Sequence, residues 1–269
     1  MYKSVVRKVK LLSVPWLALW VLATLLMVGC TTTTTQNKQP VDMDKVVQNR
    51  LQLALGYMSK GDHERARDNL NKAMALDSRS PELHDVWALL FQREMEYEEA
   101  EAHYKKALSY DPKFTRGRNN YGLFLMRLNR YEEAYQQFSL GTEDLGYPKR
   151  AELFYKTGVA ALKLDKLPEA ENAFTRAAVL NPTLSFAYLE LAELSFKKKD
   201  YPRARQLLSK YNDTKNAPSP RGLWLGVRLE HNIGNQDAEA SQGLALRNMF
   251  PNSRENQEYQ SWLKNEQEK

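Results

Sequence analysis

Few side chains in this sequence could carry out covalent or metal chemistry. The chain of 269 residues has one cysteine, Cys30, and four histidines at positions 63, 84, 103 and 231. None of the histidines has the spacing to another histidine or to the cysteine that is typical of a zinc site. The sequence also lacks a phosphate-binding glycine loop and a G-x-S-x-G nucleophile motif. We therefore expect a protein that is not an enzyme, with an enzyme of unrecognised type as the alternative.

Adjacent glutamates are the remaining candidates for acid–base chemistry. They occur as Glu98–Glu99 and Glu132–Glu133. Both pairs fall where a helix is expected to begin, and carboxylates at that end are stabilised by the helix dipole. His84 lies on an apolar helical stripe, which favours a packing role. These residues are therefore interpreted as structural.

Cys30 follows a segment with the parts of an export signal. A basic head at Lys3–Lys10 precedes an apolar stretch at Trp16–Val28, and the segment ends Met-Val-Gly-Cys. This ending resembles the lipobox of bacterial lipoproteins. The resemblance implies that residues 1–29 are a signal peptide and that Cys30 carries a covalent lipid, with no other cofactor. The alternative is an uncleaved membrane anchor, because Leu11–Val28 is almost long enough to span a bilayer.

The residues after Cys30 bear on location and charge. Thr31 takes the place of the aspartate that retains similar lipoproteins in the inner membrane. The resemblance thus implies the inner leaflet of the outer membrane of a Gram-negative bacterium, facing the periplasm. Four of the basic residues behind the formal charge of +6 lie in the leader, so the mature chain is almost neutral and nucleic-acid binding is not indicated. Residues 30–45 are polar and predict a flexible tether, whose threonines could alternatively be glycosylated.

A motif recurs from residue 46 onward. An alanine marks each unit, with spacings of 34, 34, 36, 34 and 36 residues, at Ala66, Ala100, Ala134, Ala170, Ala204 and Ala240. A large apolar residue follows four positions later, and a small residue follows three further on in the first four units. Helical apolar stripes lie upstream of each marker. This pattern predicts two antiparallel helices per unit, because a small residue allows helix backbones to approach closely.

The repeat resembles the tetratricopeptide repeat (TPR). The resemblance covers residues 46–252 and implies an all-α fold, a right-handed superhelical solenoid of about six helix pairs. The match is weakest in the sixth unit, where Trp224 and Ala240 fit but Arg228 and Arg247 replace small residues. Longer turns are expected at Thr142–Arg150 and Asn212–Gly222. Residues 253–269 form a polar tail, in which Trp262 and Leu263 could anchor a capping helix.

The TPR resemblance also implies a protein-binding groove lined by the first helix of each unit. The groove residues that it implies are Leu51, Leu55, Met58, Leu89, Leu123, Met126, Tyr155, Val159 and Leu162. Some of them could instead complete the core. The set is apolar, which favours an apolar helix or strand from a partner over a carboxylate clamp.

A lipobox, a short tether and six TPR units together resemble the PilF/PilW lipoproteins of type IV pilus biogenesis. Members of that family act as pilotins, which help secretin subunits to reach the outer membrane and assemble. The resemblance implies a secretin subunit as the partner, and we expect a monomer. The alternative is another periplasm-facing scaffold lipoprotein, for barrel assembly, peptidoglycan enzymes or polysaccharide export.

Overall fold

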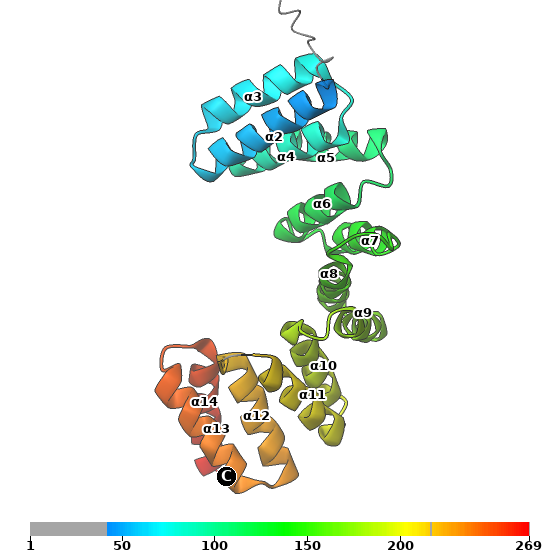
Figure 1. Ribbon diagram of the computed structural model, residues 1–269. Coiled ribbons are helices and arrows are strands. Elements are labelled where there is room, and N and C mark those ends of the chain that lie inside the picture. The colour runs from blue at the N-terminus through cyan, green and yellow to red at the C-terminus, as the bar shows by residue number, and fades with distance from the viewer. Residues whose placement is uncertain (1–41, 216, 269) are drawn as a thin grey trace, which may run out of the picture. The chain divides into compact units, whose positions relative to one another are not determined.

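The computed structural model describes residues 42–215 and 217–268. They form thirteen helices and no strand, which confirms the all-α solenoid (Figure 1). The signal segment, Cys30 and most of the tether lie outside the described residues. The helices are α2 (Met43–Ser59), α3 (His63–Leu76), α4 (Pro81–Arg93), α5 (Tyr97–Tyr110), α6 (Thr115–Arg127), α7 (Tyr131–Gly141), α8 (Arg150–Lys163), α9 (Leu167–Leu180), α10 (Ser185–Lys197), α11 (Tyr201–Thr214), α12 (Pro220–Ile233), α13 (Gln236–Met249) and α14 (Arg254–Gln267).

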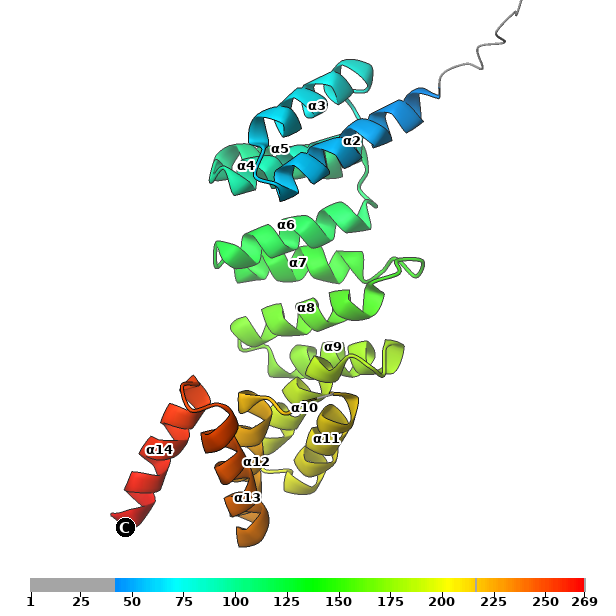
Figure 2. The ribbon, with the colours of Figure 1, turned by 60° about the vertical axis from the view of Figure 1, so that its left-hand side comes forward.

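Each unit is an antiparallel helix pair, beginning with α2 and α3 and ending with α12 and α13. Successive pairs stack along residues 43–249, as Figure 2 shows. The alanines that mark the first five units are completely buried on the second helix of each pair. These alanines therefore lie where the two helices of a pair are in contact, as the pattern predicts.

Close approach within a pair depends on glycine in two units. A Cβ atom on Gly122 of α6 would lie 2.4 Å from the ring of Phe138 in α7. A Cβ atom on Gly158 of α8 would lie 2.6 Å from the ring of Phe174 in α9. Real side chains do not tolerate such distances, so the positions of the Phe138 and Phe174 rings each require a glycine on the first helix.

The turn between the two helices of every pair contains one left-handed residue. Only two of the six are glycines: the residues are Gly61, Met95, Asn129, Asp165, Lys199 and Gly234. A left-handed conformation is unfavourable for a residue with a Cβ atom. Four turns therefore retain backbone strain that the packing of the helices holds in place.

In the sixth unit, the residues that face the core are shifted by one position from those that the sequence pattern predicts. Ala240 is exposed, whereas Gly243 and Leu246 face the core of α13. The buried positions of α12 follow those of α10 by 35 residues, which places Val227 where the other units have alanine or glycine. The large residue thus lies on the first helix and the small one on the second. A search for recurring alanines cannot detect this exchange. The prediction that Ala240 marks the helix contact of the sixth unit is therefore wrong.

Helix α14 closes the C-terminal end of the solenoid. Its Tyr259 and Trp262 pack with Trp224 of α12, with ring centroids 5.8 and 6.0 Å from that of Trp224. A Cβ atom on Gly243 would lie 2.1 Å from the hydroxyl oxygen of Tyr259, so this tyrosine fills the space above the glycine. Leu263 is partly buried in the same cluster. Helix α14 therefore occupies the place of a seventh first helix.

Candidate protein-binding groove

One residue from each first helix forms a row along the predicted groove, which we call the wall row. Its members are Leu55, Leu89, Leu123, Val159, Glu193 and Arg228. All six retain solvent exposure, and Leu123 is 40% exposed. The first four are apolar and the last two are charged. An exposed apolar row on the first helices is what a protein-binding groove requires.

Three further residues of the predicted groove lie beside the wall row. Met126 of α6, Tyr155 and Leu162 of α8 are all partly buried, each packed at the edge of a core cluster. Their apolar surface is therefore shared between the core and the wall.

Leu51 and Met58 are wrong as groove residues. Each is 2% exposed and belongs to the core between α2, α3 and α4. Together with Ala54 they form a stripe at i, i+3 and i+7, which places them on the side of α2 that faces the neighbouring helices. Of the predicted residues in α2, only Leu55 reaches the wall.

The positions equivalent to Leu51 in the next units carry buried polar residues. Asp85 of α4 is 1% exposed and accepts two hydrogen bonds from Asn120 Nδ2 of α6, at 3.0 and 3.1 Å. Arg116 lies 3.4 Å from the same carboxylate. Burial raises the pKa of Asp85 to about 6, while Asn120 and Arg116 oppose the rise. These contacts fix α4 against α6.

The same kind of contact joins α6 to α8. Lys156 of α8 donates to Asn119 Oδ1 at 2.5 Å, and Asn119 Nδ2 donates to Asn120 Oδ1 at 3.0 Å. Burial lowers the pKa of Lys156. Two residues in the sequence could have indicated these polar contacts. Asp85 and Asn119 stand at the helix position where the first unit has Leu51.

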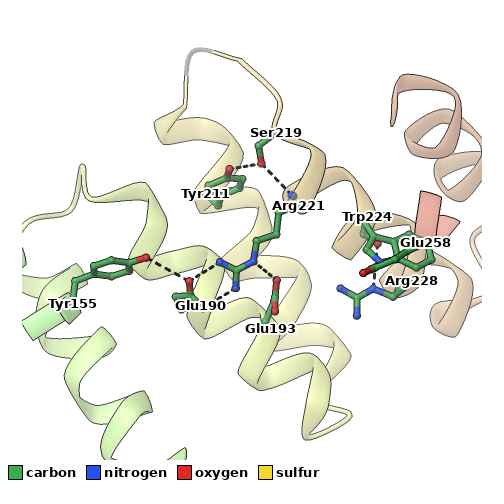
Figure 3. Close-up of polar contacts among 10 residues, drawn as sticks. Tyr155, Glu190, Glu193, Tyr211, Ser219, Arg221, Trp224, Arg228 and Glu258 are labelled. Atoms are coloured by element: carbon green, nitrogen blue, oxygen red, sulfur yellow. Dashed lines mark hydrogen bonds and ion pairs between the residues drawn. The ribbon is translucent and has the colours of Figure 1, made fainter. Parts of the chain in front are cut away.

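The C-terminal first helices are joined by charged groups (Figure 3). Arg221 of α12 donates to both oxygens of Glu190 in α10, at 2.6 and 2.7 Å, and to Glu193 at 2.7 Å. Tyr155 of α8 reaches Glu190 at 3.5 Å. The contacts from Asp85 to Arg221 form a polar ladder that holds the first helices from α4 to α12 side by side. The first helices that carry the wall row are therefore fixed relative to their neighbours.

Two histidines on neighbouring helices, His84 of α4 and His103 of α5, lie in contact. His84 is 1% exposed, as a packing role implies, and its Nδ1 lies 3.0 Å from Nδ1 of His103. Sequence reasoning treated each histidine as isolated and missed this pair. Within the described residues, no group of three or more His, Cys, Asp or Glu could hold a metal ion. None of the helices in residues 42–215 and 217–268 is long and apolar enough to span a bilayer.

The stacked helix pairs define a TPR protein. Tetratricopeptide-repeat family models match residues 47–80, 93–145 and 155–219. The type IV pilus assembly protein PilF of Pseudomonas aeruginosa is 36% identical over 237 residues, which are 87% of this chain and 94% of that protein. The chain belongs to the PilF family of type IV pilus assembly proteins. It is an assembly factor and not an enzyme.

Two solved structures support the same assignment. The structure of P. aeruginosa PilF is similar with a TM-score of 0.72 and 36% identity, covering 81% of this chain and 98% of that one. The structure of PilW, described as a widely conserved type IV pilus biogenesis factor, has a TM-score of 0.67 and 27% identity, covering 80% and 98%. The fold is thus shared along nearly the whole of each relative.

Proposed function

We propose that this chain is a pilotin: an outer-membrane lipoprotein that binds secretin subunits of the type IV pilus in its groove and promotes their localisation and assembly. The observation that carries the proposal is the apolar part of the wall row, Leu55 to Val159, in a protein of the PilF family. Neighbouring Met126 and Leu162 extend that surface.

An apolar segment from the secretin would cover this row. Full burial of a leucine or valine side chain contributes about 1.5–3 kcal/mol, so the row supplies a substantial part of a stable complex. The polar ladder holds the helices before the partner arrives, which reduces the entropy lost on binding. Met126 adds a flexible, polarizable side chain that adapts to the shape of the segment.

The lipid on Cys30 supplies the membrane address in this proposal. Each acyl methylene that enters the bilayer contributes about 0.8 kcal/mol, and two or more chains anchor a protein stably. The polar residues after Cys30 let the solenoid reach secretin subunits in the periplasm. Cys30 lies outside the described residues, so its role is supported by the sequence pattern.

Complementation of a gene deletion tests both parts of the proposal. The deletion strain receives the wild type, Cys30→Ala or Leu123→Glu, and secretin multimers are measured in isolated outer membranes. We expect multimers with the wild type, few with Cys30→Ala and few with Leu123→Glu. Unchanged multimers in the deletion and in every complemented strain would contradict a pilotin role. The other scaffold roles, in barrel assembly, peptidoglycan enzymes or polysaccharide export, would then be tested by co-purification.

A further inference from the structure

The wall row changes character at its C-terminal end. Four apolar residues are followed by Glu193 of α10 and Arg228 of α12. The carboxylate of Glu193 accepts a hydrogen bond from Arg221 at 2.7 Å, and the same guanidinium also binds both oxygens of Glu190. Arg228 has no such ion pair among the described residues. The last member of the row is therefore a cation that no described carboxylate contacts directly.

The guanidinium of Arg228 is held between two aromatic rings. Its central carbon lies 5.2 Å from the ring centroid of Phe196 in α10 and 5.2 Å from that of Trp224 in α12. Trp224 is itself fixed, because its Nε1 donates to Glu258 of α14 at 3.0 Å. Arginine stacked on aromatic faces gains a cation–π attraction and loses freedom of rotation. The side chain is thus oriented before any ligand binds.

The hydrogen bonds of Arg228 leave most of its donors unused. Its Nε donates to the backbone oxygen of Trp224 at a long 3.4 Å, the only hydrogen bond of this side chain with a described residue (Figure 3). The two terminal nitrogens have no hydrogen-bond partner in residues 42–215 and 217–268. The guanidinium therefore keeps a free fork of N–H groups.

Nearby carboxylates pair directly with other cations, and Glu190 and Glu193 share one of them, Arg221. Glu190 is bound by Arg221, Glu230 pairs with Arg205 at 3.1 Å, and Glu258 pairs with Arg254 at 2.8 Å. Burial lowers the pKa of Arg228, with Glu193 and Glu258 acting in the opposite direction. A guanidinium nevertheless remains charged at neutral pH. A partly buried guanidinium whose terminal N–H groups lack hydrogen-bond partners gains free energy when a carboxylate accepts from them.

We propose that Arg228 is a carboxylate-binding residue at the end of the groove, and that it takes an aspartate or glutamate side chain of the segment bound along the apolar row. This inference rests on the proposed function, because it assigns chemistry to the same partner. A planar fork matches a carboxylate through two parallel N–H···O bonds. The segment then carries apolar side chains over α6 and α8 and an acidic side chain over α12, which fixes its direction in the groove.

Binding of solubilised secretin monomers to the mature, lipidated chain in detergent tests the inference. We expect Arg228→Ala to weaken the affinity at least tenfold. Arg228→Lys should recover little, because an ammonium cannot make the two parallel bonds. The matched control is Arg176→Ala: Arg176 also stacks on an aromatic ring, 5.5 Å from the centroid of Phe154, but lies on the second helix α9. This control should bind as the wild type does.

Replacement of each acidic residue of the secretin segment by its amide identifies the ligand. One such replacement in the secretin should weaken its affinity for the wild-type chain at least tenfold. The same replacement should not weaken its affinity for the Arg228→Ala variant any further. The inference is overturned if every replacement acts equally on both proteins, if Arg228→Lys restores full affinity, or if only the secretin's terminal carboxylate is coupled. Equal binding of wild type and Arg228→Ala, with binding lost in Leu123→Glu, overturns the inference and leaves the pilotin proposal standing.

A small probe separates the two proposals completely. The protein is titrated separately with N-acetylglutamate α-amide, which has one side-chain carboxylate, and with the uncharged N-acetylglutamine amide, at constant ionic strength. The Nε–H resonance of Arg228 is followed by NMR in both titrations. We expect a saturable shift with the glutamate derivative alone, and none at Arg176. If the shift occurs while secretin does not bind, the carboxylate site stands and the pilotin proposal fails. Equal shifts with both probes, no shift, or a shift produced only by anionic lipid vesicles overturn the site.

Discussion

His84 of α4 and His103 of α5 share one hydrogen bond between their Nδ1 atoms, 3.0 Å apart. His84 Nε2 lies 3.1 Å from the backbone oxygen of Ser78, which can only accept. His84 is therefore protonated on Nε2, and its Nδ1 accepts from His103. Burial lowers the pKa of both rings, that of His103 to about 4, and nearby Lys106 acts in the same direction.

Acid should weaken the fold through this pair. The lowered pKa values mean that the unfolded chain takes up protons first, so stability is complete above a pH of about 6.5 and falls as the pH approaches about 4. His103→Asn keeps a donor toward His84 and removes one titrating ring. Urea unfolding between pH 7 and pH 4.5 should show a loss for the wild type that exceeds the variant's by about 1–2 kcal/mol. The opposite contribution of Asp85 cancels in this difference. Identical losses would refute the assignment.

Gly158→Ala should destabilise the solenoid by about 1–3 kcal/mol, because the new methyl group meets the ring of Phe174. Gly56→Ala in α2 is the matched control, since no atom lies within 4 Å of a Cβ placed there. It should leave stability unchanged or raise it by up to about 1 kcal/mol through helix propensity. Urea midpoints check both. A tolerated Gly158→Ala would show that the pair can separate.

Lys199→Gly should stabilise the chain by about 1 kcal/mol, because Lys199 is left-handed with φ of 59°. Lys197→Gly is the paired control. Lys197 is also exposed and is the last residue of the helix α10, where glycine should destabilise the helix by up to about 0.5 kcal/mol, less than in a helix interior. Both changes remove one positive charge, so opposite shifts in thermal midpoint isolate the backbone effect. Shifts of the same sign would exclude it.

Leu123 and Met58 should separate binding from folding. Leu123→Glu places a charge on the exposed wall and should reduce secretin binding at least tenfold with a thermal midpoint close to that of the wild type. Met58→Ala opens a cavity in the core and should lower stability by about 2–5 kcal/mol, with binding retained below the unfolding temperature. Calorimetry and affinity measurements on both variants decide. If the folded Met58→Ala variant lost binding, Met58 would have to be a groove residue after all.

The helix pairs could be predicted because small residues recur where two helices touch. The markers of the first five units, from Ala66 to Ala204, are completely buried, and packing at such a point tolerates little else. The exposure of a first-helix residue is harder to predict, because it depends on the neighbouring first helix. Leu51 and Leu55 have the same side chain, yet only Leu55 lies on the wall.

The polar ladder was beyond a single-sequence argument. Asp85, Asn120 and Lys156 lie in different units, and their partners become evident only when the helices are side by side. The sixth unit was misassigned because Val227 and Gly243 exchange the usual large and small roles. The assignment of Arg228 to the small-residue position was wrong, because Val227 occupies that position and Arg228 lies in the wall row. Its aromatic neighbours Phe196 and Trp224 were not associated with it.

The exchange of Val227 and Gly243 also limits how the chain can be recombined. The other units place alanine or glycine on the first helix and a large residue on the second, so they share one packing arrangement in the repeat array. A hybrid pair that combines α12 with another unit's second helix would place two large residues at one contact. Modular rearrangement can therefore duplicate or delete internal units, whereas the last pair must be inherited whole, together with α14.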